Sequence, residues 1–81
     1  MTVFVRNGCA FSAAVLAQLE ALGLTVTKKY LEDPGVADEL LARGGRLQVP
    51  FLVDERHDAE LYDSNLIMHY LDEHYGSEAS R

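Results

Sequence analysis

The pattern that most restricts the fold of this chain is a strand, a turn, a helix and a second strand within its first 30 residues. β-Branched and aromatic residues fill Thr2–Arg6, and Asn7-Gly8 then favours a turn. Ala10–Leu22 has apolar residues at helical spacing and is closed by Gly23, and Thr25–Tyr30 favours a second strand. A strand–helix–strand unit requires two parallel strands joined by a right-handed crossover. The opening of the chain therefore predicts an α/β fold.

The second half of the chain predicts one more helix and then a hairpin. Asp33-Pro34 offers an N-cap followed by proline at the first helical position, and the helix that follows ends at Gly44-Gly45. Val49–Asp54 and Ala59–Tyr62 are strand-like segments joined by the charged turn Glu55–Asp58. This hairpin adds antiparallel strands to the sheet.

The last helix is predicted to begin at Asp63 or Ser64 and to end at Gly76. The complete order is strand, helix, strand, helix, strand, strand, helix, which predicts a mixed four-stranded sheet with three helices. We expect residues 1–76 to form a single domain and residues 77–81 to form a polar C-terminal tail.

Charge and composition exclude several classes of function. The 81 residues carry a formal net charge of -6, whereas a nucleic acid or an anionic membrane needs clustered positive charge. No apolar run approaches the roughly 20 residues that span a bilayer, and no signal-peptide pattern opens the chain. We therefore expect a cytoplasmic domain with no nucleic-acid or membrane partner. A single cysteine also excludes an intramolecular disulfide and a zinc cluster built within one chain.

That single cysteine, Cys9, lies where the first strand turns into the first helix. Unpaired backbone N–H groups and the positive end of the helix dipole favour a thiolate there, and Arg6 adds a positive charge nearby. A thiolate at neutral pH is a nucleophile. The alternative is a small buried hydrophobic side chain without a chemical role. The position between strand and helix favours the nucleophile.

Two further positions are typical of a site for a peptide or an amino acid. Pro50 opens a strand to which it cannot donate an N–H, so we expect a bend or a cis bond that leaves the N–H and C=O of Val49 to an extended peptide. An ordinary proline at a strand start is the alternative. Asp63 and Ser64, at a helix N-terminus, can hold the ammonium and the carboxylate of an amino-acid end. Simple N-capping is the alternative for this pair.

Three segments of the chain together resemble the glutaredoxin family. They are Cys9-Ala10-Phe11-Ser12 after the first strand, Gln48-Val49-Pro50 before the third, and Leu61-Tyr62-Asp63-Ser64-Asn65 at the last helix. The last segment is most similar to the N-terminal, glutathione-binding domain of glutathione transferases. The resemblance covers nearly the whole chain and implies a thioredoxin-like (glutaredoxin) fold.

The resemblance also implies a glutathione site and a role for each of its residues. Cys9 is the nucleophile, and Pro50 is the cis-proline beside it. Val49 pairs with the glutathione backbone, and Asp63 and Ser64 hold the γ-glutamyl end.

Further roles follow from the same resemblance. Arg6 and Arg46 are candidates for the glycine carboxylate of glutathione, with a solvated side chain as the alternative for either. Ser12 stands where dithiol relatives have a second cysteine. Its hydroxyl is expected to donate a hydrogen bond to the Cys9 sulfur or to cap the first helical turn. Without a second thiol in the chain, only a monothiol route remains.

The expected function is therefore reduction of protein–glutathione mixed disulfides by a monomer, with Cys9 and Ser12 as catalytic residues. One alternative is a [2Fe–2S] carrier, in which Cys9 from each of two chains and two glutathione molecules supply four thiolates. Ala10 departs from the C-G-F-S motif of that branch. The other alternative is a glutathione-binding module without turnover. A full glutathione transferase needs a second, all-helical domain that 81 residues cannot contain.

The remaining charged residues have simpler interpretations. His57, His69 and His74 show no spacing typical of a metal site, so they are interpreted as surface residues. The acidic residues of the hairpin are interpreted as a solvated face that discourages edge pairing, namely Asp54, Glu55, Asp58 and Glu60.

Overall fold

The helices and strands follow the predicted order in the computed structural model, which describes residues 1–76. The predicted tail at residues 77–81 lies outside the described residues. No helix among residues 1–76 is long and apolar enough to cross a membrane. The elements are β1 (Thr2–Val5), α1 (Ala10–Ala21), β2 (Thr27–Tyr30), α2 (Val36–Gly44), β3 (Phe51–Asp54), a 3-10 turn η1 (Glu55–His57), β4 (Ala59–Tyr62), α3 (Ser64–Leu71) and a π-helical turn η2 (Asp72–Gly76).

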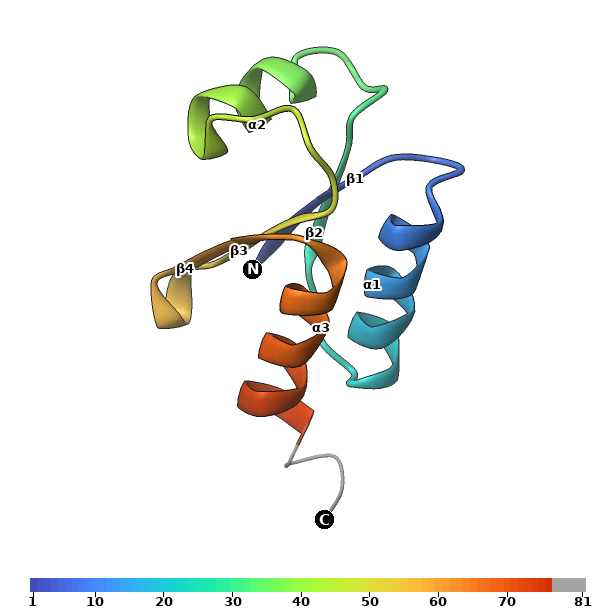
Figure 1. Ribbon diagram of the computed structural model, residues 1–81, viewed down its shortest axis with the longest axis vertical. Coiled ribbons are helices and arrows are strands. Elements are labelled where there is room, and N and C mark those ends of the chain that lie inside the picture. Colours follow the sequence, from blue (N-terminus) through green and yellow to red (C-terminus); the bar gives the residue numbers. More distant parts are fainter. Residues whose placement is uncertain (77–81) are drawn as a thin grey trace.

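The four strands form one mixed sheet in the order β2-β1-β3-β4 (Figure 1). β1 and β2 are parallel, as predicted, whereas β3 pairs antiparallel with both β1 and β4. In this register Phe51 lies opposite both Phe4 and Tyr62. The end of β1, the start of β3 and the end of β4 therefore meet at one end of the sheet. The turn into α1 and the turn into α3 both begin at that end.

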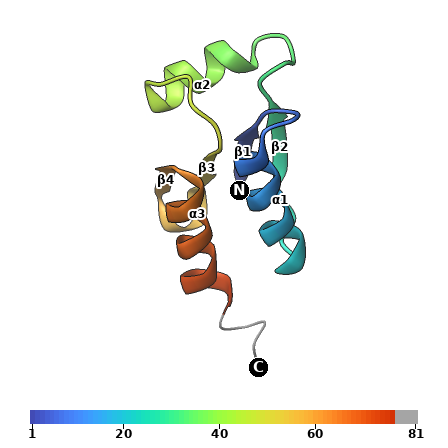
Figure 2. The same ribbon diagram turned by 45° about the vertical axis from the view of Figure 1, so that its right-hand side comes forward.

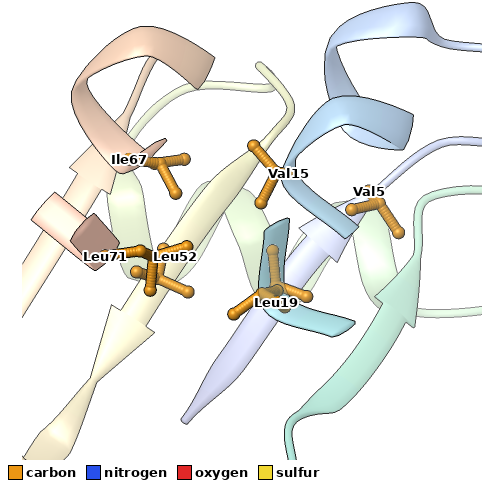
Figure 3. Close-up of a cluster of buried hydrophobic side chains, with 7 residues drawn as sticks. Val5, Val15, Leu19, Leu52, Ile67 and Leu71 are labelled. Atoms are coloured by element: carbon orange, nitrogen blue, oxygen red, sulfur yellow. The ribbon is translucent and has the colours of Figure 1, made fainter. Parts of the chain in front are cut away.

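Helices cover both faces of the sheet. α1 and α3 lie side by side on one face, and α2 lies apart from them on the other (Figure 1 and Figure 2). Side chains alternate along β1, so Val3 and Val5 join the cluster under α1 and α3, whereas Phe4 packs with Leu40 of α2. Figure 3 shows the first cluster, in which Ile67 of α3 also lies. Because both faces are covered, β1 and β3 are buried along nearly their whole length.

α2 begins later than the sequence predicts. The carbonyl of Asp33, the predicted N-cap, accepts a hydrogen bond from the Val36 amide at 3.2 Å and so closes a turn. Gly35 is the N-cap instead, in the left-handed region with φ 82°. Glycine adopts this conformation at no steric cost. The prediction of Pro34 as the first helical residue is therefore wrong.

Three strands are also shorter than predicted, and β1 ends at Val5 rather than Arg6. β3 begins at Phe51 rather than Val49, because Pro50 has no N–H to donate to the ladder. β2 begins at Thr27, whose amide donates to the Met1 carbonyl at 3.0 Å, where pairing with β1 can first occur.

The interpretation of the hairpin acids as a solvated face is wrong for Asp54, which is 2% exposed. Its Oδ2 accepts hydrogen bonds from the hydroxyls of Tyr70 at 2.6 Å and Tyr75 at 2.7 Å, and lies 2.9 Å from His57 Nδ1. Burial alone would raise the pKa of Asp54, but these hydrogen bonds outweigh it and lower the pKa from 3.8 to about 2. The other members of the set are exposed as predicted: Glu55, Asp58 and Glu60.

The histidines lie at the surface, as predicted, but two of them have aromatic neighbours. The ring of His57 lies against that of His74 with centroids 4.6 Å apart, and Tyr70 lies 4.4 Å from His74. His69 is exposed on α3. This aromatic group covers Asp54 and joins the end of β3 to the C-terminal half of α3.

Candidate active site

Cys9 is the N-cap residue of α1, at the junction between β1 and α1. Gly8, directly before it, has a left-handed φ of 77°, which lets the chain turn sharply from strand into helix. The Cys9 carbonyl accepts the first helical hydrogen bond, from the Ala13 amide at 2.9 Å. The half-buried thiol therefore lies at the positive end of the α1 dipole, as the sequence predicts.

Ser12 supports both this thiol and the turn before it. Its side chain is buried, and its Oγ accepts a hydrogen bond from the Arg6 amide at 3.3 Å. Hydrogen bonding by the Ser12 side chain is the largest influence on the pKa of Cys9, and it lowers that pKa. The amides of Ser12 and Phe11 and the charge of Arg6 lower the pKa further, while burial opposes them. At neutral pH the thiolate fraction of Cys9 therefore exceeds that of an ordinary cysteine.

A cleft of about 230 Å³ opens between the α2–β3 connection and the start of α3. Val49 and Pro50 line it from the connection, and the bond between them is cis, one of the two geometries predicted. Asp63 and Ser64 line it from α3, and Phe11 lines it from the first turn of α1. The structure thus brings together four of the residues predicted to bind glutathione. Their role in binding stays a prediction at this point.

Asp63 caps α3, as the sequence predicts. Its Oδ1 accepts hydrogen bonds from the amides of Asn65 at 2.8 Å and Leu66 at 3.5 Å. Within residues 1–76 the other carboxylate oxygen has no hydrogen-bond partner, and the residue is exposed. Ser64, the first residue of α3, presents a backbone N–H that has no acceptor within the helix. The two predicted roles, capping and ligand binding, are therefore compatible in this pair.

Val49 brings an unpaired backbone to the opposite wall. Its side chain is half-buried, and its N–H and C=O make no backbone hydrogen bond within residues 1–76. Unpaired groups in an extended segment can accept an added peptide strand.

Cys9 itself lines a neighbouring groove of about 370 Å³, together with Arg6, Gly8 and Tyr30. Phe11, two residues further along the same helical turn, lines the cleft. The thiol therefore lies in this groove, and the first turn of α1 contributes one residue to the groove and another to the cleft. Arg6 lies beside the thiol, and its predicted contact with a carboxylate stays a prediction.

Arg46 lies over an aromatic ring. Its guanidinium carbon lies 4.4 Å from the centroid of the Tyr62 ring, which is a cation–π arrangement. The side chain is exposed, and Arg46 does not line the cleft. The exposed position fits the predicted alternative of a solvated side chain, and the contact of Arg46 with the glycine carboxylate of glutathione stays a prediction.

Sequence reasoning assigned no role to three residues that line the cleft, namely Phe11, Gln48 and Asn65. Helical spacing places Phe11 on one face with Val15 and Leu19, which are buried, yet Phe11 is 65% exposed. The available signal was its position two residues after Cys9, in the first helical turn.

The fold and the cleft together define a thioredoxin-like domain. The glutathione S-transferase N-terminal domain family matches residues 3–79, and the chain belongs to this family. The similarity predicted for the last helix therefore extends over nearly the whole chain, whereas the monothiol glutaredoxin type stays a prediction. Comparison with curated protein sequences gives no match.

Solved structures agree with this assignment. A glutathione transferase, URE2P6, from Phanerochaete chrysosporium in complex with oxidized glutathione is 28% identical over 95% of this chain, with a TM-score of 0.80. An epsilon-class glutathione S-transferase from the housefly Musca domestica is 26% identical over 98% of the chain, with a TM-score of 0.79. The chain covers 37% of each of these two proteins. It therefore spans little more than a third of their length.

The comparisons give no support to the iron–sulfur alternative, in which each chain supplies only Cys9. Residues 1–76 contain no group of three or more His, Cys, Asp or Glu side chains that could hold a metal ion. The structures described above are glutathione transferases, and one of them holds oxidized glutathione.

Proposed function

We propose that this domain is a glutathione-dependent thiol–disulfide oxidoreductase that reduces protein–glutathione mixed disulfides by a monothiol route. The observation that carries the proposal is the half-buried thiol of Cys9, whose pKa is lowered and which lies on the same helical turn as Phe11, a residue that lines the cleft. A relative of 28% identity holds oxidized glutathione, which is a disulfide of the same tripeptide. This supports glutathione as the co-substrate.

Each wall of the cleft offers groups that complement one part of glutathione. The backbone N–H and C=O of Val49 are free to pair with the cysteinyl residue of the tripeptide. The free carboxylate oxygen of Asp63 complements the γ-glutamyl ammonium, and the Ser64 hydroxyl and amide complement its carboxylate. Arg6, beside the thiol, supplies a positive charge for the glycine carboxylate.

The reaction consists of two thiol–disulfide exchanges. The Cys9 thiolate attacks the glutathione sulfur of the mixed disulfide, the S–S bond breaks, and the protein thiolate leaves and takes a proton from water. Cys9 then carries a disulfide to glutathione. A second glutathione thiolate attacks the glutathione sulfur, releases oxidized glutathione and restores the Cys9 thiolate. The net reaction reduces one mixed disulfide and oxidises one glutathione.

The setting that suits this chemistry is a reducing one. A lone thiol with a lowered pKa stays available as a thiolate only where glutathione is kept reduced, so we propose that the domain works in the cytoplasm. The monothiol route needs one Cys9 per reaction, so we propose a monomer as the working unit. A glutathione-binding module without turnover is the outcome if Cys9 proves unreactive.

The test is turnover of a glutathionylated peptide by the full chain, with glutathione, glutathione reductase and NADPH. Cys9→Ser should lower turnover by about 100-fold or more, because a neutral hydroxyl replaces the thiolate. Glutathione affinity, measured by calorimetry, should change by less than about twofold, because the cleft walls remain. Equal turnover by the wild type and Cys9→Ser contradicts the proposal. Binding of glutathione without any turnover assigns the domain as a binding module.

A further inference from the structure

Tyr62 joins the two walls of the cleft. It ends β4, and the next residue, Asp63, opens the wall formed by α3. The opposite wall belongs to the α2–β3 connection, which contains Arg46 and Val49 and forms neither helix nor strand. A segment without its own helical or strand hydrogen bonds depends on other contacts for its position.

The Tyr62 hydroxyl supplies such contacts at the beginning of the connection. It donates a hydrogen bond to the Arg46 carbonyl at 2.8 Å and accepts one from the Arg46 amide at 3.2 Å. The Arg46 guanidinium lies over the ring of the same tyrosine, 4.4 Å from its centroid. One side chain therefore holds both the backbone and the side chain of Arg46.

The ring of Tyr62 also reaches the other end of the connection. Phe51, which directly follows Pro50, lies opposite Tyr62 in the sheet, and the two ring centroids are 4.3 Å apart. Phe51 is buried, so this contact anchors the ring to the core. Tyr62 thus contacts the chain on both sides of residues 47–50, the segment that holds Val49 at the cleft.

Gly44 shows how closely the ring approaches the backbone. A Cβ atom at this position would lie 2.1 Å from the Tyr62 hydroxyl oxygen and 2.8 Å from Cζ. Both distances are shorter than any ordinary contact, so a side chain at position 44 would displace the ring. Glycine at position 44 therefore leaves the space that the Tyr62 hydroxyl occupies beside the end of α2.

We infer that Tyr62 is a positioning residue for the peptide-binding cleft. It holds the connection that carries Val49 and so sets the position of this wall relative to Asp63 and Ser64, between which the γ-glutamyl tripeptide is proposed to bind. This inference rests on the proposed function, because its ligand is glutathione. It also assigns Arg46 to the contacts that hold the connection rather than to direct binding of the ligand.

The test compares Tyr62→Phe with Tyr75→Phe in the full chain. Tyr62→Phe keeps the ring, its packing on Phe51 and the space at Gly44, but removes both hydrogen bonds to Arg46. It should weaken glutathione binding by about threefold to tenfold in calorimetry. In turnover it should raise KM for glutathione and leave kcat within about twofold. Tyr75→Phe removes a hydrogen bond to Asp54 far from the cleft, so it should lower stability without changing glutathione affinity.

The outcomes separate this inference from the proposed function. Unchanged affinity in folded Tyr62→Phe overturns the inference and leaves the proposed function intact. Equal weakening by Tyr62→Phe and Tyr75→Phe also overturns it, because the effect is then one of stability. If the wild type itself binds no glutathione, both the proposed function and the inference are wrong. Arg46→Gln provides a second variant. A larger loss of glutathione affinity in Arg46→Gln than in Tyr62→Phe would indicate that Arg46 binds the ligand directly and would overturn its assignment to the contacts with Tyr62.

Discussion

Cys9 and Asp54 lie at opposite ends of the sheet, and the pKa of each is lowered, but their surroundings differ. Asp54 is 2% exposed, and its carboxylate accepts hydrogen bonds from two tyrosine hydroxyls, from the ring of His57 and from the Arg56 amide. Cys9 is half-buried and lines an open groove. The same direction of pKa shift therefore accompanies a closed network at one end of the sheet and a solvent-accessible thiol at the other.

The comparison also shows that the size of a cavity does not identify the site. A cleft of about 330 Å³ adjoins Asp54, which is larger than the cleft of about 230 Å³ at Asp63. Three of the charged groups at the larger cleft already have partners, since the Met1 ammonium lies 3.3 Å from Glu55 Oε1 and Asp54 accepts hydrogen bonds from two tyrosine hydroxyls. At the smaller cleft, Val49 and Asp63 keep unpaired polar atoms for a ligand.

The largest effect on stability is expected when the buried hydrogen-bond network around Asp54 is disrupted. Asp54→Ala leaves the hydroxyls of Tyr70 and Tyr75 without their acceptor, and should lower the free energy of unfolding by about 3 kcal/mol. Chemical denaturation measures this change. Glu60→Ala is the control, because its ion pair with Arg43 is exposed and should contribute less than about 1 kcal/mol. Similar losses in both variants would contradict the description of Asp54 as the centre of a buried network.

Low pH should lower the free energy of unfolding through the same carboxylate. The pKa of Asp54 is lowered from 3.8 to about 2, so the carboxylate contributes full stability above its unfolded pKa of 3.8. That contribution, about 2 kcal/mol, should be lost as the pH falls through 3.8 toward about 2. The free energy of unfolding measured between pH 6 and about 2 should fall less steeply in Asp54→Asn. Parallel pH profiles for the two proteins would show that another carboxylate controls acid unfolding.

Two variants of Asp63 distinguish its role in capping α3 from its proposed role in binding glutathione. Asn retains an oxygen for the amides of Asn65 and Leu66 but has no charge, so Asp63→Asn should change stability by less than about 0.5 kcal/mol. It should weaken glutathione binding by about tenfold, because the γ-glutamyl ammonium loses its partner. Asp63→Ala loses the cap as well, at a cost of about 1 kcal/mol in stability. Unchanged affinity in Asp63→Asn would leave capping as the only role of this residue.

The smallest effect is expected at Ser12. Ser12→Ala removes the hydroxyl that most lowers the pKa of Cys9, so that pKa should rise and alkylation of the thiol at neutral pH should slow. The Arg6 amide also loses its acceptor, at a cost of about 1 kcal/mol. Ser12→Thr, which keeps a hydroxyl, is the matched control. An alkylation rate that is unchanged in Ser12→Ala would assign Ser12 to the turn alone.

Local signals in the sequence were sufficient for most of the fold. Helical spacing, strand-like runs and the cap at Asp63 each act within a few residues, and the element order that they predict is confirmed. The start of α2 was missed because two local signals compete, and the turn at Asp33 takes precedence over the proline after it. The cleft was predictable in part because Val49 and Asp63 belong to motifs of characteristic order.

Contacts between distant segments were not predictable from local patterns. Asp54 looks like one of several hairpin acids until Tyr70 and Tyr75, 16 and 21 residues away, approach it in the folded chain. Arg46 likewise has no sequence signal that places it over Tyr62. Both depend on the packing of α2 and α3 against the sheet.

The central claim is that Cys9 is an accessible thiol with a lowered pKa, and the rate of its alkylation as a function of pH tests this claim most directly. Cys9 is the only cysteine of the chain, so iodoacetamide labelling reports on this thiol alone. The account predicts a titration midpoint below that of a free cysteine labelled under the same conditions, with full labelling of the folded protein. A midpoint at or above that value, or labelling only after unfolding, would contradict it.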